Sequence, residues 1–147
     1  SEFKKENRSF CKKVQKSEKY GFAWTNSYIV CTFHDTTDFP TSMLATEDSE
    51  KINVDTILKL LGNEEANTVI EYKTIKSRLS SLTTKKEKDN DAIEISGALF
   101  RTRHIEKVFK FYNVTRLEMY VKENRPAYGF IDNDKETPFI ICSLYKK

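Results

Sequence analysis

The chain has 147 residues, of which 38% are hydrophobic and 32% charged, with four Gly, three Pro and a formal net charge of +3. This composition excludes collagen-like, low-complexity and disulfide-scaffold proteins, and a chain of this length buries a core without disulfide or metal support. No apolar run approaches the ~18 residues of a membrane span, and no signal-peptide pattern occurs. The three Cys are far apart and form no CxxC pair, so we expect reduced thiols, an intracellular location, no membrane contact and no metal or other cofactor.

Bases are concentrated near the N-terminus. Between Lys4 and Lys19 there are seven bases and two acids. The chain begins without Met, and we interpret residues 1–19 as a basic segment that is partly vector-derived, followed by a single domain over 20–147. Apolar spacing predicts a helix over Ser9–Lys16. Its bases would lie opposite Phe10 and Val14, and they are Lys12, Lys13 and Lys16.

The middle of the chain alternates strand-like and helix-like runs. Asp55 is expected to cap a short helix that continues through Leu61 and stops at Gly62. The charged run 85–91 is expected to be an exposed connection. Alternating apolar residues and β-branched or aromatic residues predict strands elsewhere. These strands are Tyr20–Trp24, Tyr28–Phe33, Lys51–Val54, Thr68–Lys73 and Ser77–Thr84.

The last 56 residues, 92–147, carry the clearest pattern. Ala92–Ile95 alternates like a half-buried strand, and Thr102–Tyr112 has the apolar stripe of an amphipathic helix. Three alternating runs separated by turn-rich linkers then predict an antiparallel meander. They are Arg116–Lys122, Ala127–Asp132 and Phe139–Tyr145. We predict an α+β fold in which an antiparallel sheet carries short helices on one face, built from strand–helix–meander units.

The Thr102–Tyr112 helix also carries a row of bases. Arg103, Lys107 and Lys110 follow one another at i, i+4 and i+7, away from the apolar stripe. Bases spaced by one helical turn can follow a phosphate backbone without reading its sequence. We therefore predict non-specific contacts to duplex DNA by this row and by the N-terminal row. A solvated helix surface explains the same residues, since Lys and Arg favour helices.

No catalytic motif is recognisable. The sequence contains no phosphate-binding glycine loop, nucleophile elbow, HExxH motif or EF-hand loop. The two histidines, His34 and His104, are far apart, and neither has a motif partner. We expect a protein that is not an enzyme and has no catalytic residues.

The C-terminal pattern resembles the closing half-repeat of a DNA sliding clamp of the bacterial polymerase III β type. The resemblance rests on the run from Ala92 to Ser96, the helix ending at Phe109 and the three strands that follow, whose last stretch, Phe139–Ser143, lacks the proline usual in the family. It extends more loosely to Trp24–Val30 and Asp38-Phe39-Pro40. The strand–helix junction around Ile95 also resembles translation initiation factor 2 β and factor 5, without the cysteines of their zinc ribbon.

The clamp resemblance implies a ring in which basic helices surround duplex DNA and sheets form the outside. It further implies self-association of the chain and a surface pocket for peptides of polymerases or repair proteins. A second hypothesis of a different class is an adaptor domain that binds a partner peptide by strand addition at a sheet edge or by an aromatic surface. The aromatic residues concerned are Tyr20, Phe22, Trp24 and Tyr28, for which core packing is the alternative.

Overall fold

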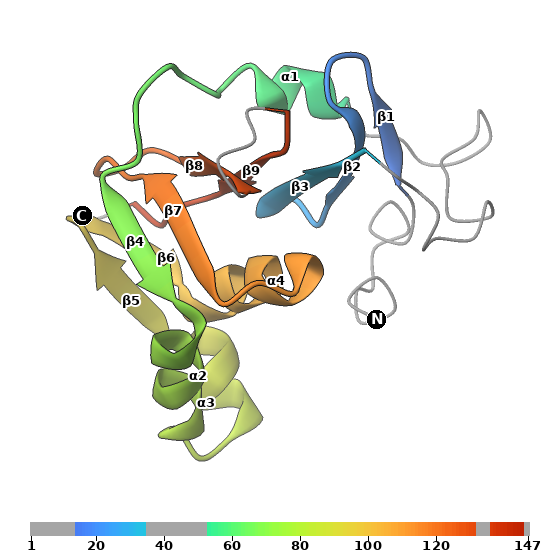
Figure 1. Cartoon of the computed structure of the whole chain (residues 1–147). Helices are drawn as coiled ribbons and strands as arrows, with labels where there is room; N and C mark the ends of the chain where they lie inside the picture. The colour runs from blue at the N-terminus through green and yellow to red at the C-terminus, as the bar shows by residue number, and fades with distance from the viewer. Residues whose placement is uncertain (1–13, 35–52, 132–135, 146–147) are drawn as a thin grey trace.

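The computed structural model describes residues 14–34, 53–131 and 136–145 (Figure 1). Seven strands form one antiparallel sheet in the order β1-β2-β3-β9-β8-β7-β4, and β5 and β6 form a separate hairpin. The strands are β1 (Gln15–Ser17), β2 (Gly21–Thr25), β3 (Ile29–Phe33), β4 (Thr68–Glu71), β5 (Ala92–Ile95), β6 (Ala98–Arg101), β7 (Arg116–Tyr120), β8 (Ala127–Phe130) and β9 (Pro138–Ile141). The helices are α1 (Val54–Leu58), α2 (Tyr72–Ser80), α3 (Lys85–Asn90) and α4 (Thr102–Tyr112). The predicted α+β fold with an antiparallel sheet is confirmed.

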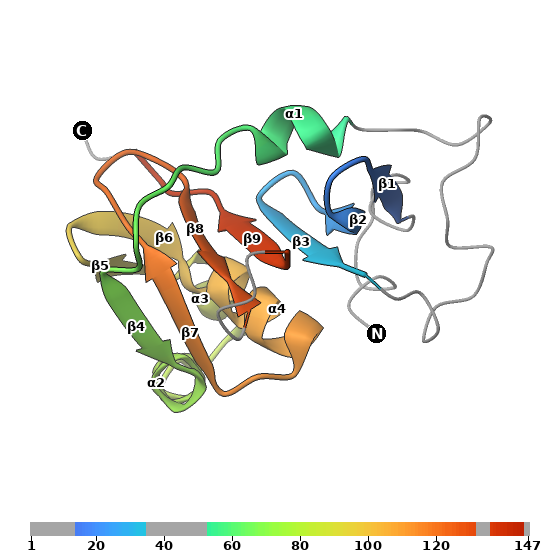
Figure 2. The same cartoon turned by 45° about the horizontal axis from the view of Figure 1, so that its top comes forward.

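The sheet has apolar residues on both faces because side chains alternate along each strand. One face packs against α4 and α2, and its core includes Trp24, Phe100, Phe109, Met119 and Phe139. The other face packs against α1, which lies on the opposite side of the sheet from α4 (Figures 1 and 2). The smaller core beneath α1 contains Tyr20, Ala23, Val30, Val54, Leu58, Tyr128 and Ile140. The sequence analysis places all helices on one face of the sheet, whereas α1 lies on the other face.

The helix and the meander of the predicted C-terminal unit are present, with small shifts of the strand boundaries. Its first strand, β5, instead pairs with β6, a strand that the sequence analysis did not predict, in a hairpin outside the seven-stranded sheet. Helix α4 has the predicted bounds and buries Ile105, Val108 and Phe109. Asn113 ends it in the left-handed conformation (φ 53°), and its backbone N–H donates to the carbonyl of Phe109. Strands β7, β8 and β9 follow as the meander, and β9 also pairs with β3, which joins the N-terminal strands to the C-terminal ones.

Four predictions for the middle and N-terminal segments are wrong. The segment Ser77–Thr84 is predicted as a strand, but its first half belongs to α2, because Ile75 and Leu79 lie one helical turn apart and are both buried. The expected connection 85–91 contains α3, whose cap is Thr84. A helix is predicted over Ser9–Lys16, but the last two residues of this range belong to strand β1, and residues 9–13 lie outside the described residues. Val54, expected to close a strand, is the first residue of α1.

Candidate nucleic-acid interface

Helices α2, α3 and α4 form one helical layer on the same face of the sheet, with α4 packed against both of the others (Figure 1). These helices contain nine bases and three acids, a surplus of six positive charges. The chain as a whole has a net charge of only +3. The positive charge is therefore concentrated on these helices and on the N-terminal segment 4–19, which has seven bases and two acids. The bases of the three helices are Lys73, Lys76, Arg78, Lys85, Lys86, Lys88, Arg103, Lys107 and Lys110.

Helix α2 is held down by its apolar side. Ile75 and Leu79 are buried in the main core, and the ring of Tyr72 lies 5.3 Å from that of Phe109 in α4. Lys73 and Lys76 are exposed on the outer side of this helix. They are three positions apart in the helix, so their side chains are neighbours on the helix surface.

The bases of α4 lie beside carboxylates. The guanidinium of Arg103 is 3.1 Å from Asp89 of α3 and 2.9 Å from Glu106, and the ammonium of Lys110 is 3.6 Å from the other oxygen of Glu106. Burial lowers the pKa of Arg103, but the hydrogen bonds and charges of Glu106 and Asp89 outweigh it and raise the pKa overall. Part of the positive charge of α4 is thus neutralised within the layer.

Asp91 joins the parts of the helical layer. Its carboxylate accepts hydrogen bonds from Arg78 Nε of α2 at 2.6 Å and from the hydroxyl of Thr102, the first residue of α4, at 2.6 Å. Arg78 also donates to the carbonyl of Ala92 at 2.8 Å. The hydrogen bonds from Arg78 are the main reason that the pKa of Asp91 is lowered. This carboxylate therefore fixes α2, the start of β5 and the N-terminus of α4 relative to one another.

The structure brings together only part of the predicted DNA-binding set. Arg103, Lys107 and Lys110 share α4, whereas Lys16 is exposed on β1, at the opposite edge of the sheet from β4. Lys12 and Lys13 lie outside the described residues. Sequence reasoning missed Lys73 and Lys76 because it assigned part of α2 to a strand. The spacing of Ile75 and Leu79 was the signal that could have found them.

The aromatic residues of the alternative hypothesis do not form a surface. Trp24 is completely buried and stacks on Phe111 with ring centroids 5.6 Å apart, and Tyr20 is buried under α1. Phe22 is partly buried against the main core. Tyr28 alone of the four is largely exposed, at 44%, and its ring stacks on His104.

The two cysteines in the part of the chain that the structure describes, Cys31 and Cys142, both lie where burial disfavours the thiolate. Cys142 lies in the same cavity as His104, but burial raises the pKa of its thiol, which disfavours the thiolate. Cys31 is buried in the main core, and burial raises its pKa as well. Within residues 14–34, 53–131 and 136–145, no group of three or more His, Cys, Asp or Glu is placed to hold a metal ion. No helix in these ranges has the length and apolar character to cross a bilayer.

Two comparisons with known proteins identify no relative of this chain. A scan against protein-family models and a search of curated proteins each found no match to this chain. The resemblance to sliding clamps therefore rests on the sequence pattern alone.

Proposed function

We propose that this protein is a non-enzymatic DNA-associated module that contacts duplex phosphates without sequence preference through the helical layer. The observation that carries the proposal is the surplus of six positive charges on α2, α3 and α4, against +3 for the whole chain. Since these helices share one face of the sheet, their side chains can approach one duplex together.

The contacts would be electrostatic. Each Lys or Arg that neutralises a phosphate releases a condensed counterion, so affinity falls as salt rises, with a slope of about −0.9 per phosphate contact in a log–log plot. The exposed bases of α2, Lys73 and Lys76, are the strongest candidates because neither forms an ion pair within the part of the chain that the structure describes. Arg103, Lys107 and Lys110 would contribute less, because two of these three face Glu106.

The clamp resemblance agrees with this placement. It implies helices toward the duplex and sheet on the outside, and α2, α3 and α4 do lie on one side of the seven-stranded sheet (Figure 2). A ring around DNA would need several copies of such a unit, so self-association belongs to the proposal. Peptides of polymerases or repair proteins would be the protein partners of such a ring.

The proposal is tested with a pair of matched double charge reversals. The Lys73→Glu/Lys76→Glu variant changes the helical layer, and Lys59→Glu/Lys122→Glu changes net charge equally at exposed residues outside it. Binding of a fluorescent 20-base-pair duplex is followed by anisotropy between 50 and 200 mM salt, and circular dichroism confirms that both variants are folded. We expect the first variant to lose affinity and to make the salt slope shallower by about 1.8, for two lost contacts. An equal loss of duplex affinity in both variants would contradict the proposal, and so would an affinity that does not depend on salt concentration.

A further inference from the structure

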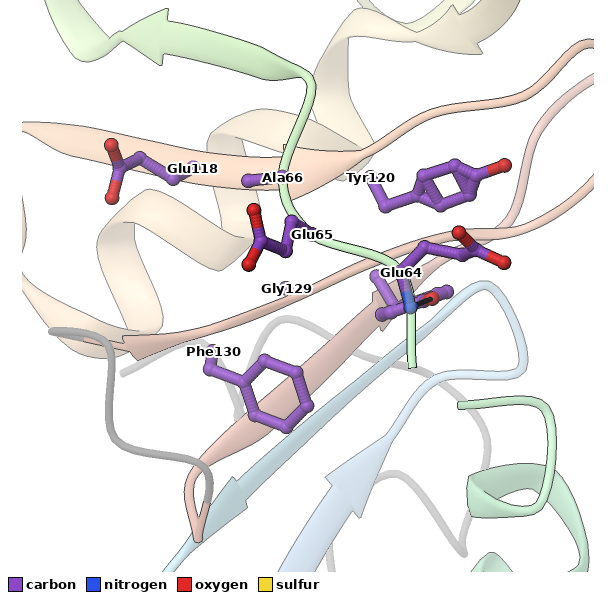
Figure 3. Close-up of a pocket in the computed structure, with 8 residues that line it drawn as sticks. Glu64, Glu65, Ala66, Glu118, Tyr120, Gly129 and Phe130 are labelled. Carbon is purple, nitrogen blue, oxygen red and sulfur yellow. Dashed lines mark hydrogen bonds between the residues drawn. The ribbon is translucent and has the colours of Figure 1, made fainter. Parts of the chain in front are cut away.

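The face of the sheet opposite the helical layer has a pocket that α1 leaves uncovered. Its volume is about 360 Å³, and it lies over β7 and β8, beneath the segment that connects α1 to β4 (Figure 3). We call it the sheet pocket. It is lined chiefly by carboxylates and aromatic rings, namely Glu64, Glu65, Glu118, Tyr120, Tyr128 and Phe130.

The connecting segment is fixed at both ends. At the first, the backbone N–H of Glu64 donates to the hydroxyl of Tyr128 at 3.1 Å. Gly62 lies so close to the same hydroxyl that a Cβ there would be 2.7 Å from it. At the second, the side chain of Asn67 donates to the carbonyl of Val121 at 2.9 Å and accepts from its N–H at 2.9 Å. These contacts hold Glu64 and Glu65 over the strands.

The aromatic rings come from alternate positions of β7 and β8, which place them on one face. Tyr120 and Tyr128 meet edge to face with centroids 5.6 Å apart, and Phe130 is two residues further along β8. Figure 3 shows Glu64 beside the ring of Tyr120, and Glu65 near Gly129, with Phe130 next to it on β8. The pocket therefore has both carboxylates and the faces of aromatic rings in its lining.

The charges of the lining decide which ligand fits. Three carboxylates line the pocket, and within the described residues Arg116 pairs with one of them, its guanidinium lying 3.2 Å from Glu118. Glu64 and Glu65 are exposed. An acidic segment would be repelled here. A purely apolar segment would bury these two carboxylates without partners, which is costly. A cation is attracted both by the carboxylates and by the faces of aromatic rings.

We propose that the sheet pocket receives a Lys or Arg side chain from a basic segment of a protein partner, with Glu64 and Glu65 binding the charge and Tyr120 and Phe130 contacting the alkyl stem or the guanidinium plane. The proposal rests on charge complementarity and on rings gathered in one concave site. It does not depend on DNA binding, because the pocket and the helical layer lie on opposite faces of the sheet.

The test uses the whole chain labelled with ¹⁵N and the end-blocked peptide Gly-Arg-Gly-Arg-Gly as the probe, with Gly-Glu-Gly-Glu-Gly as its counterpart. We expect the arginine peptide to shift the amide signals of residues 64–66, 118–120 and 128–130, and the glutamate peptide to leave them unchanged. Glu64→Gln/Glu65→Gln should weaken the peptide about tenfold, for two lost charge-assisted contacts. Tyr120→Leu, which keeps an apolar side chain, should weaken it about two- to fivefold.

The matched control is Glu18→Gln/Glu123→Gln, which removes two exposed carboxylates outside the pocket. It should leave the peptide affinity within twofold of the unmodified chain. Equal weakening by this control, or shifts spread over acidic residues of the whole surface, would overturn the proposal. Pocket signals that move with protein concentration in the absence of peptide would overturn it too, because a second copy of the chain would then be the occupant.

Discussion

Glu106 is the residue through which the electrostatics of the helical layer can be altered most simply. Its carboxylate pairs with Lys110 and with Arg103, which also pairs with Asp89, and its side chain is only 13% exposed. Glu106→Gln removes one negative charge from the layer while keeping the shape of the side chain. Arg103 would still face Asp89 at 3.1 Å, so the change chiefly releases Lys110.

The expected magnitudes follow from these contacts. One additional phosphate contact makes the salt slope of DNA binding steeper by about 0.9, so the affinity gained by the variant at 50 mM salt shrinks about threefold by 200 mM. Stability should fall at the same time by about 1 kcal/mol, since partly exposed ion pairs contribute little and Gln retains a hydrogen bond to Arg103. The variant would thus bind more tightly although it is less stable.

The assay is anisotropy of a labelled duplex across the salt series, with thermal unfolding measured in parallel. Glu123→Gln serves as the control, since it raises net charge by the same amount at an exposed residue outside the helical layer. The control should leave the salt slope unchanged. The reasoning is refuted if a folded Glu106→Gln protein has the same slope as the control, or a shallower one.

Three other predictions concern the fold that supports the layer. The pKa of Asp91 lies below its ordinary value of 3.8, so its carboxylate stabilises the folded state above that pH and loses this effect as the pH falls through the folded-state pKa. Asp91→Asn should therefore lower the denaturation midpoint at pH 7 and remove part of the acid-induced loss seen in urea titrations between pH 5 and pH 2; an unchanged pH profile would contradict this. Because burial raises its pKa, the thiol of Cys31 should stay unlabelled by a thiol reagent at pH 8 until the chain unfolds, whereas half-buried Cys142 should react slowly in the native state, as mass spectrometry of the peptides would show. Gly129→Ala should cost about 3 kcal/mol or more, because its Cβ would lie in contact with the backbone oxygen of Glu118, and a thermal midpoint close to that of the unmodified chain would be evidence against this close approach.

The helix and the meander of the C-terminal unit could be predicted because their local signals agree with their packing. The stripe of Ile105, Val108 and Phe109 has the helical period, and each of these residues is buried against the sheet. Asn113 supplies the left-handed residue that ends the helix. Where the period, the cap and the burial indicate the same element, the sequence is sufficient to place it.

The segment before it could not be predicted in the same way. Helix α2 has only two buried residues, Ile75 and Leu79, and its first turn follows β4 directly without a capping side chain. Helix α3 has no buried residue and depends on Thr84, which accepts from the backbone of Glu87. Short helices of this kind form through tertiary contacts that local propensity does not reveal.

The charges of the candidate site were predictable as a pattern but not as contacts. The spacing of Arg103 and Lys110 correctly placed both on α4. The distance of 3.1 Å between Asp89 and Arg103 depends on α3 folding beside α4, and the sequence analysis predicts an exposed connection in place of α3. The sheet pocket likewise depends on a connection between α1 and β4 crossing strands that come more than fifty residues later in the chain.

The central claim is that the helical layer, and not the sheet, faces DNA. The most direct measurement is the ¹H–¹⁵N chemical-shift map of the whole chain on addition of a short duplex at low salt. The account predicts that the perturbed amides lie in α2, α3 and α4, centred on Lys73 and Lys76, and that the shifts disappear as salt is raised. Perturbations centred on β7, β8 and the sheet pocket, or none in the helices at a duplex concentration that saturates binding, would contradict it.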